Sequence, residues 1–194
     1  MDMPFDADTD ISDDVLLARF ARGDKTAARL LTSRLTPLAF NHAYRLLGHR
    51  AEAEDVAQEA MLRLWRIAPD WRPGTAKVTT WMYRVVANLC TDRLRKSGRA
   101  APLAEAGEPP DPRPDAPETL QEADRARALY SALDGLPDRQ RQAIVLRHLE
   151  ELTNPEIAGI MEISVEAVES LLARGKRSLS ANLKPNKDKL GYLQ

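Results

Sequence analysis

Basic side chains gather in two segments of the chain, residues 84–99 and residues 174–189. Around the start of the second segment, four polar residues recur at helical spacing and would share one face of a helix: Glu166, Ser170, Arg174 and Arg177. Guanidinium groups on such a face can bind phosphates and base edges, and carboxylates can accept hydrogen bonds from bases. The chemistry that these residues offer is therefore recognition of nucleic acid.

A short helix and a tight turn come directly before this polar face. Residues 153–156, Thr-Asn-Pro-Glu, fit a capping box in which the threonine caps the helix and the glutamate reaches back to it. Residues 162–164 would form the turn, and Ser164 should cap a longer helix from Val165 to about Leu179. This pattern is typical of a DNA-binding helix-turn-helix, although an ordinary helical hairpin would show it too.

The elements that position these residues are all predicted to be helices, because no segment shows the alternation of a strand. The clearest period lies at residues 78–99, where the apolar residues form one stripe: Val78, Trp81, Met82, Val85, Val86, Leu89 and Leu94. A helix at 51–68 precedes it. Earlier still, we expect a helix from Asp13 to Gly23, a second up to Leu35, and a third that Pro37 opens and Gly48 ends.

Composition divides this all-α chain into two small helical domains, at residues 13–97 and 119–183. The first twelve residues read as a disordered acidic tail and residues 184–194 as a basic tail. Between the domains, residues 98–118 are acidic and rich in proline, which is typical of a flexible, extended linker. After it, a helical pattern resumes near Leu120, breaks at Gly135 and Pro137, and continues to Leu149.

The bulk composition excludes several classes of protein. Cys90 is the one cysteine and there are three histidines, so a disulfide or a zinc site is not expected. No apolar run is long enough to span a membrane, and the N-terminus is acidic where a signal peptide would be basic. The net charge is only −1, but the basic residues are clustered. We expect a cytoplasmic protein without metal, cofactor or enzymatic activity.

Several motifs, in this order, resemble the extracytoplasmic-function sigma factors of bacterial RNA polymerase, which belong to the sigma-70 family. The resemblance covers roughly residues 13–97 and 120–181, so it includes the helix-turn-helix. Outside the helix-turn-helix, the segments that carry it are Ala21–Asp24, Ala53–Ala60, Thr80–Leu89, Asp92–Arg95 and Leu136–Arg141. The resemblance implies sigma region 2 in the first domain and sigma region 4 in the second. It also implies three partners. These are core polymerase, bound through its largest-subunit clamp helices and its flap, promoter DNA, and an anti-sigma factor.

The resemblance assigns roles to two helices of the first domain. Asp55, Gln58 and Glu59 match the positions that grip the clamp helices, although exposed acidic helix residues are usually only solvated. The helix after residue 78 matches the element that holds the minus-ten promoter sequence as a single strand, and the loop Trp71–Thr79 matches one that captures a flipped base. The implied minus-ten contacts are Trp71, Arg84, Asn88, Arg93, Arg95 and Lys96. Trp71 and Trp81 also suit packing in the core.

In the second domain, the resemblance implies that the second helix of the helix-turn-helix reads the minus-thirty-five element. The implied contacts are Glu166, Glu169, Ser170, Ala173, Arg174, Lys176 and Arg177. Glu169 and Leu171 depart from the family, in which many members carry basic residues at these positions. This departure alters the expected sequence preference and not the fold.

Two other classes of protein fit parts of these observations. An enzyme, the third class, is not favoured, because the sequence shows no metal cluster, nucleophile–base pair or phosphate-binding loop. A helix-turn-helix regulator that acts without polymerase would explain residues 120–181 but not the polar helix around Asp55 or the helix at 78–99. A sigma mimic that titrates an anti-sigma factor would need no basic face for DNA, whereas this chain has two. The promoter, the inducing signal and the arrangement of the domains do not follow from the sequence.

Overall fold

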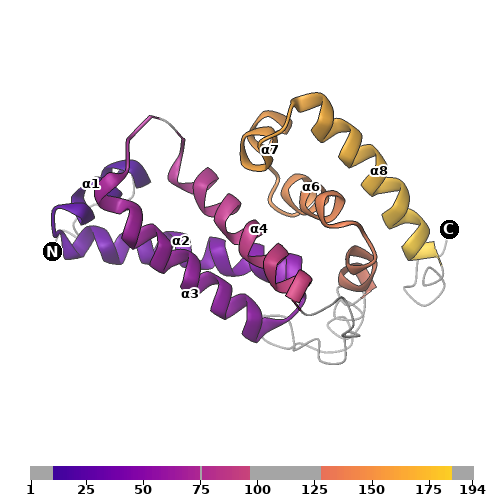
Figure 1. Cartoon of the computed structure of the whole chain (residues 1–194), viewed down its shortest axis with the longest axis horizontal. Coiled ribbons are helices and arrows are strands. Elements are labelled where there is room, and N and C mark those ends of the chain that lie inside the picture. Colours follow the sequence, from indigo (N-terminus) through magenta and orange to yellow (C-terminus); the bar gives the residue numbers. More distant parts are fainter. Residues whose placement is uncertain (1–10, 75, 97–127, 185–194) are drawn as a thin grey trace, which may run out of the picture.

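The computed structural model describes residues 11–74, 76–96 and 128–184, and these residues form helices, turns and loops without a strand. The N-terminal domain contains α1 (Asp13–Ala21), α2 (Lys25–Leu47), α3 (Arg50–Ile67), the 3-10 turn η1 (Ala68–Asp70) and α4 (Val78–Lys96). The C-terminal domain contains a helical stretch at 128–134, followed by α6 (Asp138–His148), α7 (Asn154–Met161) and α8 (Val165–Leu183). The prediction of two small all-α domains is confirmed (Figure 1).

Local signals set several helix ends. The Asp24 carboxylate accepts hydrogen bonds from the backbone N–H groups of Thr26 and Ala27, at 2.8 and 3.2 Å, and so begins α2. Gly48 ends the same helix in the left-handed conformation, with a φ of 68°, as its position in the sequence predicted. Ser12 caps α1, so this residue belongs to the N-terminal domain rather than to the expected acidic tail.

One expectation about the first domain was wrong: α2 runs through Pro37 without a break. Proline removes one backbone donor and normally interrupts a helix. Here the helix buries Leu31 and Leu35 before Pro37 and Ala39 and Ala43 after it. Packing of both halves against α1, α3 and α4 outweighs the cost of the missing hydrogen bond.

The helix-turn-helix prediction is confirmed in the C-terminal domain. The Thr153 backbone N–H and hydroxyl both donate to the Glu156 carboxylate, at 3.0 and 2.7 Å, at the start of α7. Ser164 caps α8 by accepting a hydrogen bond from the Ala167 N–H at 3.2 Å. α8 extends to Leu183, four residues beyond the predicted end near Leu179.

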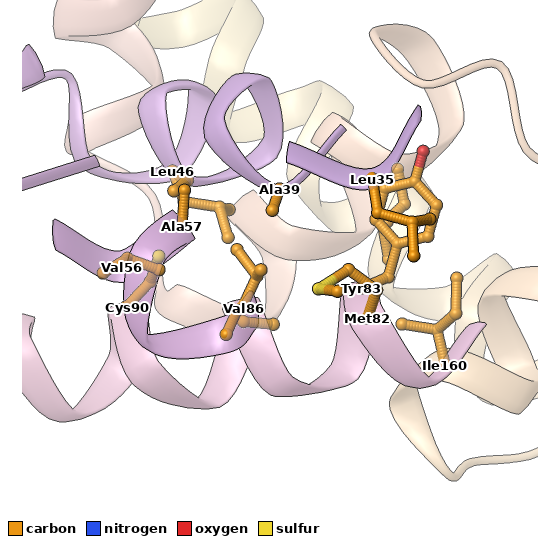
Figure 2. Packing of buried hydrophobic residues seen from close by; sticks show 14 of the residues in the cluster. Leu35, Ala39, Leu46, Val56, Ala57, Met82, Tyr83, Val86, Cys90 and Ile160 are labelled. Atoms are coloured by element: carbon orange, nitrogen blue, oxygen red, sulfur yellow. The ribbon is translucent and has the colours of Figure 1, made fainter. Parts of the chain in front are cut away.

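The buried side chains of the two domains form one continuous core. Figure 2 shows Ile160 of α7 next to Met82 and Tyr83 of α4, and these three residues are 3%, 0% and 8% exposed. α7 packs on α4, and α6 packs on the end of α2. The two domains therefore share an extensive interface in this structure, which neither hydrophobic periodicity nor the family resemblance indicated.

The remaining expectations from the sequence concern the linker, the two tails, membrane spans and metal sites. The proposed linker at residues 98–118 and most of both tails lie outside the described residues. Across the described ranges, no helix is at once long enough and apolar enough to cross a bilayer. The same ranges hold no cluster of three or more histidine, cysteine, aspartate or glutamate side chains placed to bind a metal.

Two glycines provide a matched test of packing in the C-terminal domain. Gly175 of α8 is buried against α6, and a Cβ there would lie 2.8 Å from the Ile144 Cγ1. Overpacking outweighs the better helix propensity of alanine, so Gly175→Ala should lower the free energy of unfolding by roughly 1 kcal/mol. Gly159 of α7 has open space around it, so Gly159→Ala should raise that free energy by about 0.5 to 1 kcal/mol. Urea denaturation of both variants checks the opposite signs.

Candidate polymerase-binding and DNA-binding surfaces

The outer face of α3 carries the residues predicted to bind core polymerase. Asp55 and Glu59 are one helical turn apart, and Gln58 lies between them on the same side. The side chains of Asp55 and Glu59 are 68% and 35% exposed, and Gln58 is exposed as well. The other side of α3 is buried, with Val56, Ala60 and Leu64 in the core. The structure thus brings the three predicted residues together on one accessible face.

Both carboxylates of this face form ion pairs with arginines of the chain, so they are not only solvated. Asp55 forms an ion pair with Arg93 of α4 at 3.5 Å, and Glu59 forms one with Arg63 at 2.8 Å. The hydrogen bond from Arg63 lowers the pKa of Glu59 below its ordinary value. The pair with Arg63 keeps the Glu59 carboxylate ionised, and both pairs orient the carboxylates. Exposed pairs of this kind contribute little to stability, so a partner can replace them at small cost.

The predicted minus-ten residues of α4 separate into two groups. A helix rotates by about 100° per residue, which places Arg84, Asn88 and Arg95 within roughly 40° of one another and Arg93 on the opposite side. Asn88 and Arg95 are exposed, while the Arg84 side chain is 34% exposed. Lys96 is exposed between the two groups at the end of α4. Arg93 therefore adjoins the polymerase-binding face and is not part of the stripe of Arg84.

Trp71, expected in the base-capturing loop, is partly buried in this structure. Its indole Nε1–H donates a hydrogen bond of 2.8 Å to the Asp14 carboxylate of α1. Its ring meets Trp81 edge to face, with centroids 6.3 Å apart and an interplanar angle of 86°. Both tryptophans pack against the core. Trp71 thus joins the loop to α1 and does not present a free stacking surface here.

α8 presents all seven predicted minus-thirty-five residues to solvent: Glu166, Glu169, Ser170, Ala173, Arg174, Lys176 and Arg177. The opposite side of α8 is buried through Val168, Leu172 and Gly175. The Arg174 guanidinium donates to the Ser170 hydroxyl at 2.9 Å, so the helix itself holds this side chain along its surface. A helix with one side anchored and the other exposed over its whole length fits the major groove.

Glu169 and Arg177 should have opposite effects on DNA binding. No ion pair of Glu169 exists among the described residues, so its carboxylate is available to accept from a cytosine and to repel phosphate. Glu169→Arg should therefore bind DNA more tightly and discriminate less between sites. Arg177→Ala should weaken binding to all sequences about equally and reduce the salt dependence. Binding isotherms at two salt concentrations measure both effects, and an unchanged specificity ratio in Glu169→Arg would contradict the role of Glu169.

Sequence reasoning missed a set of polar contacts where the two domains meet. Glu150, just after α6, reaches into the N-terminal domain and contacts His42, Arg45 and Tyr83. Arg84 of α4 contacts Glu162 in the turn of the helix-turn-helix. His42 in α2 was the one residue that could have indicated these contacts. Its partner, Glu150, is 108 residues away in the sequence.

The comparisons with known proteins match both domains separately. Residues 31–100 match sigma-70 region 2, and residues 126–179 match sigma-70 region 4. The chain is 30% identical over 185 residues to the sigma-E factor, an extracytoplasmic-function (ECF) sigma factor, of Haemophilus influenzae strain Rd, covering 90% of this chain and 97% of that one. It is 32% identical over 140 residues to the ECF sigma factor SigE of Mycolicibacterium smegmatis, covering 71% of this chain, but it spans only 54% of that longer relative.

A solved structure matches the arrangement of the whole chain. CnrH, determined in complex with the cytosolic domain of CnrY, superposes with a TM-score of 0.67 at 26% sequence identity. The superposition covers 90% of this chain and 98% of CnrH. The similarity therefore extends over both helical domains.

Proposed function

This chain belongs to the ECF sigma factors of bacterial RNA polymerase, and we propose that its three polar faces divide the work of promoter recognition. The face of α3 binds the clamp helices of core polymerase, the stripe on α4 holds the minus-ten strand, and the outer face of α8 reads the minus-thirty-five element. The observation that carries this proposal is the geometry of α8, where every predicted DNA contact is exposed and the opposite side is anchored in the core.

The polymerase contact is assigned to Asp55, Gln58 and Glu59 because they lie on one continuous helix face, with Asp55 and Gln58 exposed and Glu59 partly exposed. Exposed basic side chains of a partner would replace Arg93 and Arg63 in the ion pairs with Asp55 and Glu59. Such complementary charges accelerate association and set the register of an interface. In the proposed complex, α3 lies against helices that carry basic residues.

The minus-ten contact is assigned to Asn88, with Arg84, Arg95 and Lys96 along the strand backbone. Asn88 is exposed in the middle of the stripe, and its amide can both donate to and accept from the edge of an unpaired base. The guanidinium and ammonium groups beside it can follow the phosphates. Arg93 contributes through the polymerase-binding face, where it orients Asp55.

A protein partner should regulate this factor. CnrH, which shares its fold over both domains, is in complex with the cytosolic domain of CnrY. We propose that this chain also binds a protein partner, an anti-sigma factor that controls it in the cytoplasm, where core polymerase is found. The factor has no chemistry of its own in this scheme, since its role is to bring polymerase to the promoter and to hold the opened strand.

Run-off transcription tests the proposed function directly. The purified chain should enable core polymerase to produce discrete transcripts from a subset of promoters in a panel of candidates. Core polymerase alone and core with Asp55→Arg serve as controls. The absence of promoter-specific transcripts on the whole panel, together with no copurification with core, would contradict the proposal.

Asn88→Ala should reduce transcription from duplex promoters by about tenfold, as the loss of a hydrogen bond to the base would. The loss should be much smaller on a template that is already mismatched around the minus-ten element, because the mismatch supplies the unpairing that Asn88 stabilises. The ratio of transcript yields on the two templates is the measurement. Asp92→Ala, an exposed change on the same helix, is the matched control. Equal losses on both templates would show that Asn88 has only a structural role.

A further inference from the structure

The exposed face of α3 carries a large apolar side chain at its centre. Leu62 is 50% exposed, and across the described ranges only Leu62 and Val15 are large apolar residues with this much exposure. A helix turns by about 100° per residue, so Leu62 lies roughly 20° from Asp55 and roughly 60° from Glu59 around the axis of α3. Most contacts of α3 are with α2, α4 and η1, and Figure 1 shows α3 on the side of the N-terminal domain away from α7 and α8.

An aromatic side chain extends the apolar surface around Leu62. A single exposed leucine is common on protein surfaces and needs no partner. Trp65, however, lies three residues further along α3, so the two side chains are neighbours on the helix surface. Trp65 is partly exposed, and its ring packs on Phe20 of α1 with centroids 4.4 Å apart. Leu62 and the supported indole together offer a firm apolar contact in the middle of a polar face.

The charge of this face changes sign along α3. Asp55 and Glu59 come before Leu62, and Arg66 follows it by one helical turn, roughly 20° from Asp55 around the axis. Arg66 is exposed and forms no ion pair within the described part of the chain. Its position in the last turn also favours the helix dipole, an effect that requires no partner. The face therefore runs from acidic through apolar to basic over about 16 Å.

We propose that Leu62 is the apolar anchor of the contact with core polymerase, and that the clamp helix on α3 presents a basic, an apolar and an acidic side chain opposite Asp55, Leu62 and Arg66. This inference rests on the proposed function, because it assumes that α3 binds the clamp helices. The three groups lie on one line along α3, about 10 and 6 Å apart, which a second helix packed alongside can match. Opposite charges at the two ends would fix the direction and register of that helix.

The charged and apolar groups of this face should act on different rate constants. Exposed charges accelerate the encounter of two proteins, and salt screens them. An apolar anchor that becomes buried on binding acts after the encounter, on the dissociation rate. Leu62→Ala and Leu62→Gln should therefore raise the dissociation rate from core polymerase by about tenfold and leave the association rate and its salt dependence unchanged. Leu62→Met, which keeps an apolar side chain of similar volume, should dissociate nearly as slowly as the parent.

Reversal of the charge of Arg66 tests the proposed order of charges by its sign. If a carboxylate of the partner faces Arg66, Arg66→Glu brings two like charges together and should weaken binding to core polymerase by about tenfold. Arg66→Gln should lie between the parent and Arg66→Glu. A clamp helix that is basic along its whole length would instead bind Arg66→Glu more tightly than the parent, and this result would overturn the proposed order.

The experiment measures association and dissociation of the full chain on immobilised core polymerase at two salt concentrations. Val15→Ala is the matched control, because Val15 is 46% exposed and lies on α1, outside the face of α3. This control should match the parent in both rate constants. Circular dichroism verifies that each variant remains helical. The Leu62 variants should melt within a few degrees of the parent, because alanine, glutamine and methionine are good helix formers at an exposed position.

The outcomes separate this inference from the proposed function. The anchor is overturned if the parent binds core polymerase and Leu62→Ala and Leu62→Gln dissociate as slowly as the parent, or if Val15→Ala dissociates as fast as they do. Sedimentation equilibrium should show a monomeric free chain. A dimer that Leu62→Ala abolishes, together with normal binding of that variant to core, would assign the face to a second copy and overturn the anchor. The proposed function fails instead if the parent chain does not bind core at all.

Discussion

Asp55→Arg should lower the affinity of the chain for core RNA polymerase by about 100-fold or more. The Asp55 side chain is 68% exposed, and it is the acidic member of the α3 face nearest to α4. The substitution reverses the charge offered to a basic partner and places a cation beside Arg93, its present partner at 3.5 Å. Equilibrium binding to labelled core polymerase, or competition with another sigma factor, measures the loss.

The fold should survive this substitution. Asp55 makes no buried contact, and arginine is a better helix former than aspartate, so the melting temperature should change by only a few degrees. Asp92→Arg, which reverses the charge of an exposed residue on α4, should bind core normally. Normal core binding by Asp55→Arg, or its unfolding, would show that α3 does not carry the polymerase contact.

Arg141→Ala should destabilise the chain more than any exposed substitution, by about 3 to 5 kcal/mol. Arg141 is only 4% exposed, and its guanidinium donates to the carbonyls of Leu133 and Leu46 at 3.0 Å each and to the carbonyl and carboxylate of Asp134. Its loss leaves buried acceptors without a donor and opens a void in the C-terminal domain. The Leu46 carbonyl belongs to α2, so the contact between the domains weakens as well.

Thermal and urea denaturation of Arg141→Ala measure this loss, with Arg139→Ala as the control. Arg139 lies in the same helix but is exposed, and it donates a single hydrogen bond of 3.3 Å to the Met161 carbonyl. Its removal should cost less than about 1 kcal/mol. Arg141→Lys should remain destabilised, because one ammonium cannot reach all the acceptors that the planar guanidinium bridges. Similar stabilities of Arg139→Ala and Arg141→Ala would contradict the role of the buried network.

Much of the helix-turn-helix could be predicted from sequence because its signals are local. The capping box at Thr153 and Glu156 and the cap at Ser164 act over a few residues, and their partners are close in the chain. The exposed faces of α3 and α8 follow from helical periodicity, since a polar residue on a helix with one apolar side must point outward. The family resemblance then predicted that the face of α3 binds polymerase and that the face of α8 binds DNA.

The sequence by itself determined most of the helices, their exposed and buried sides, and the two domains. Only the tertiary structure decided which side chains meet. Packing on both sides of Pro37 made α2 one helix. The position of α4 beside α3 allows Arg93 to form an ion pair with Asp55. The contacts of Glu150 with α2 and of Arg84 with α7 join residues 75 to 108 positions apart. Periodicity specifies the direction of a side chain from its own helix axis, whereas its partner depends on how the helices pack, and that is decided by the whole core.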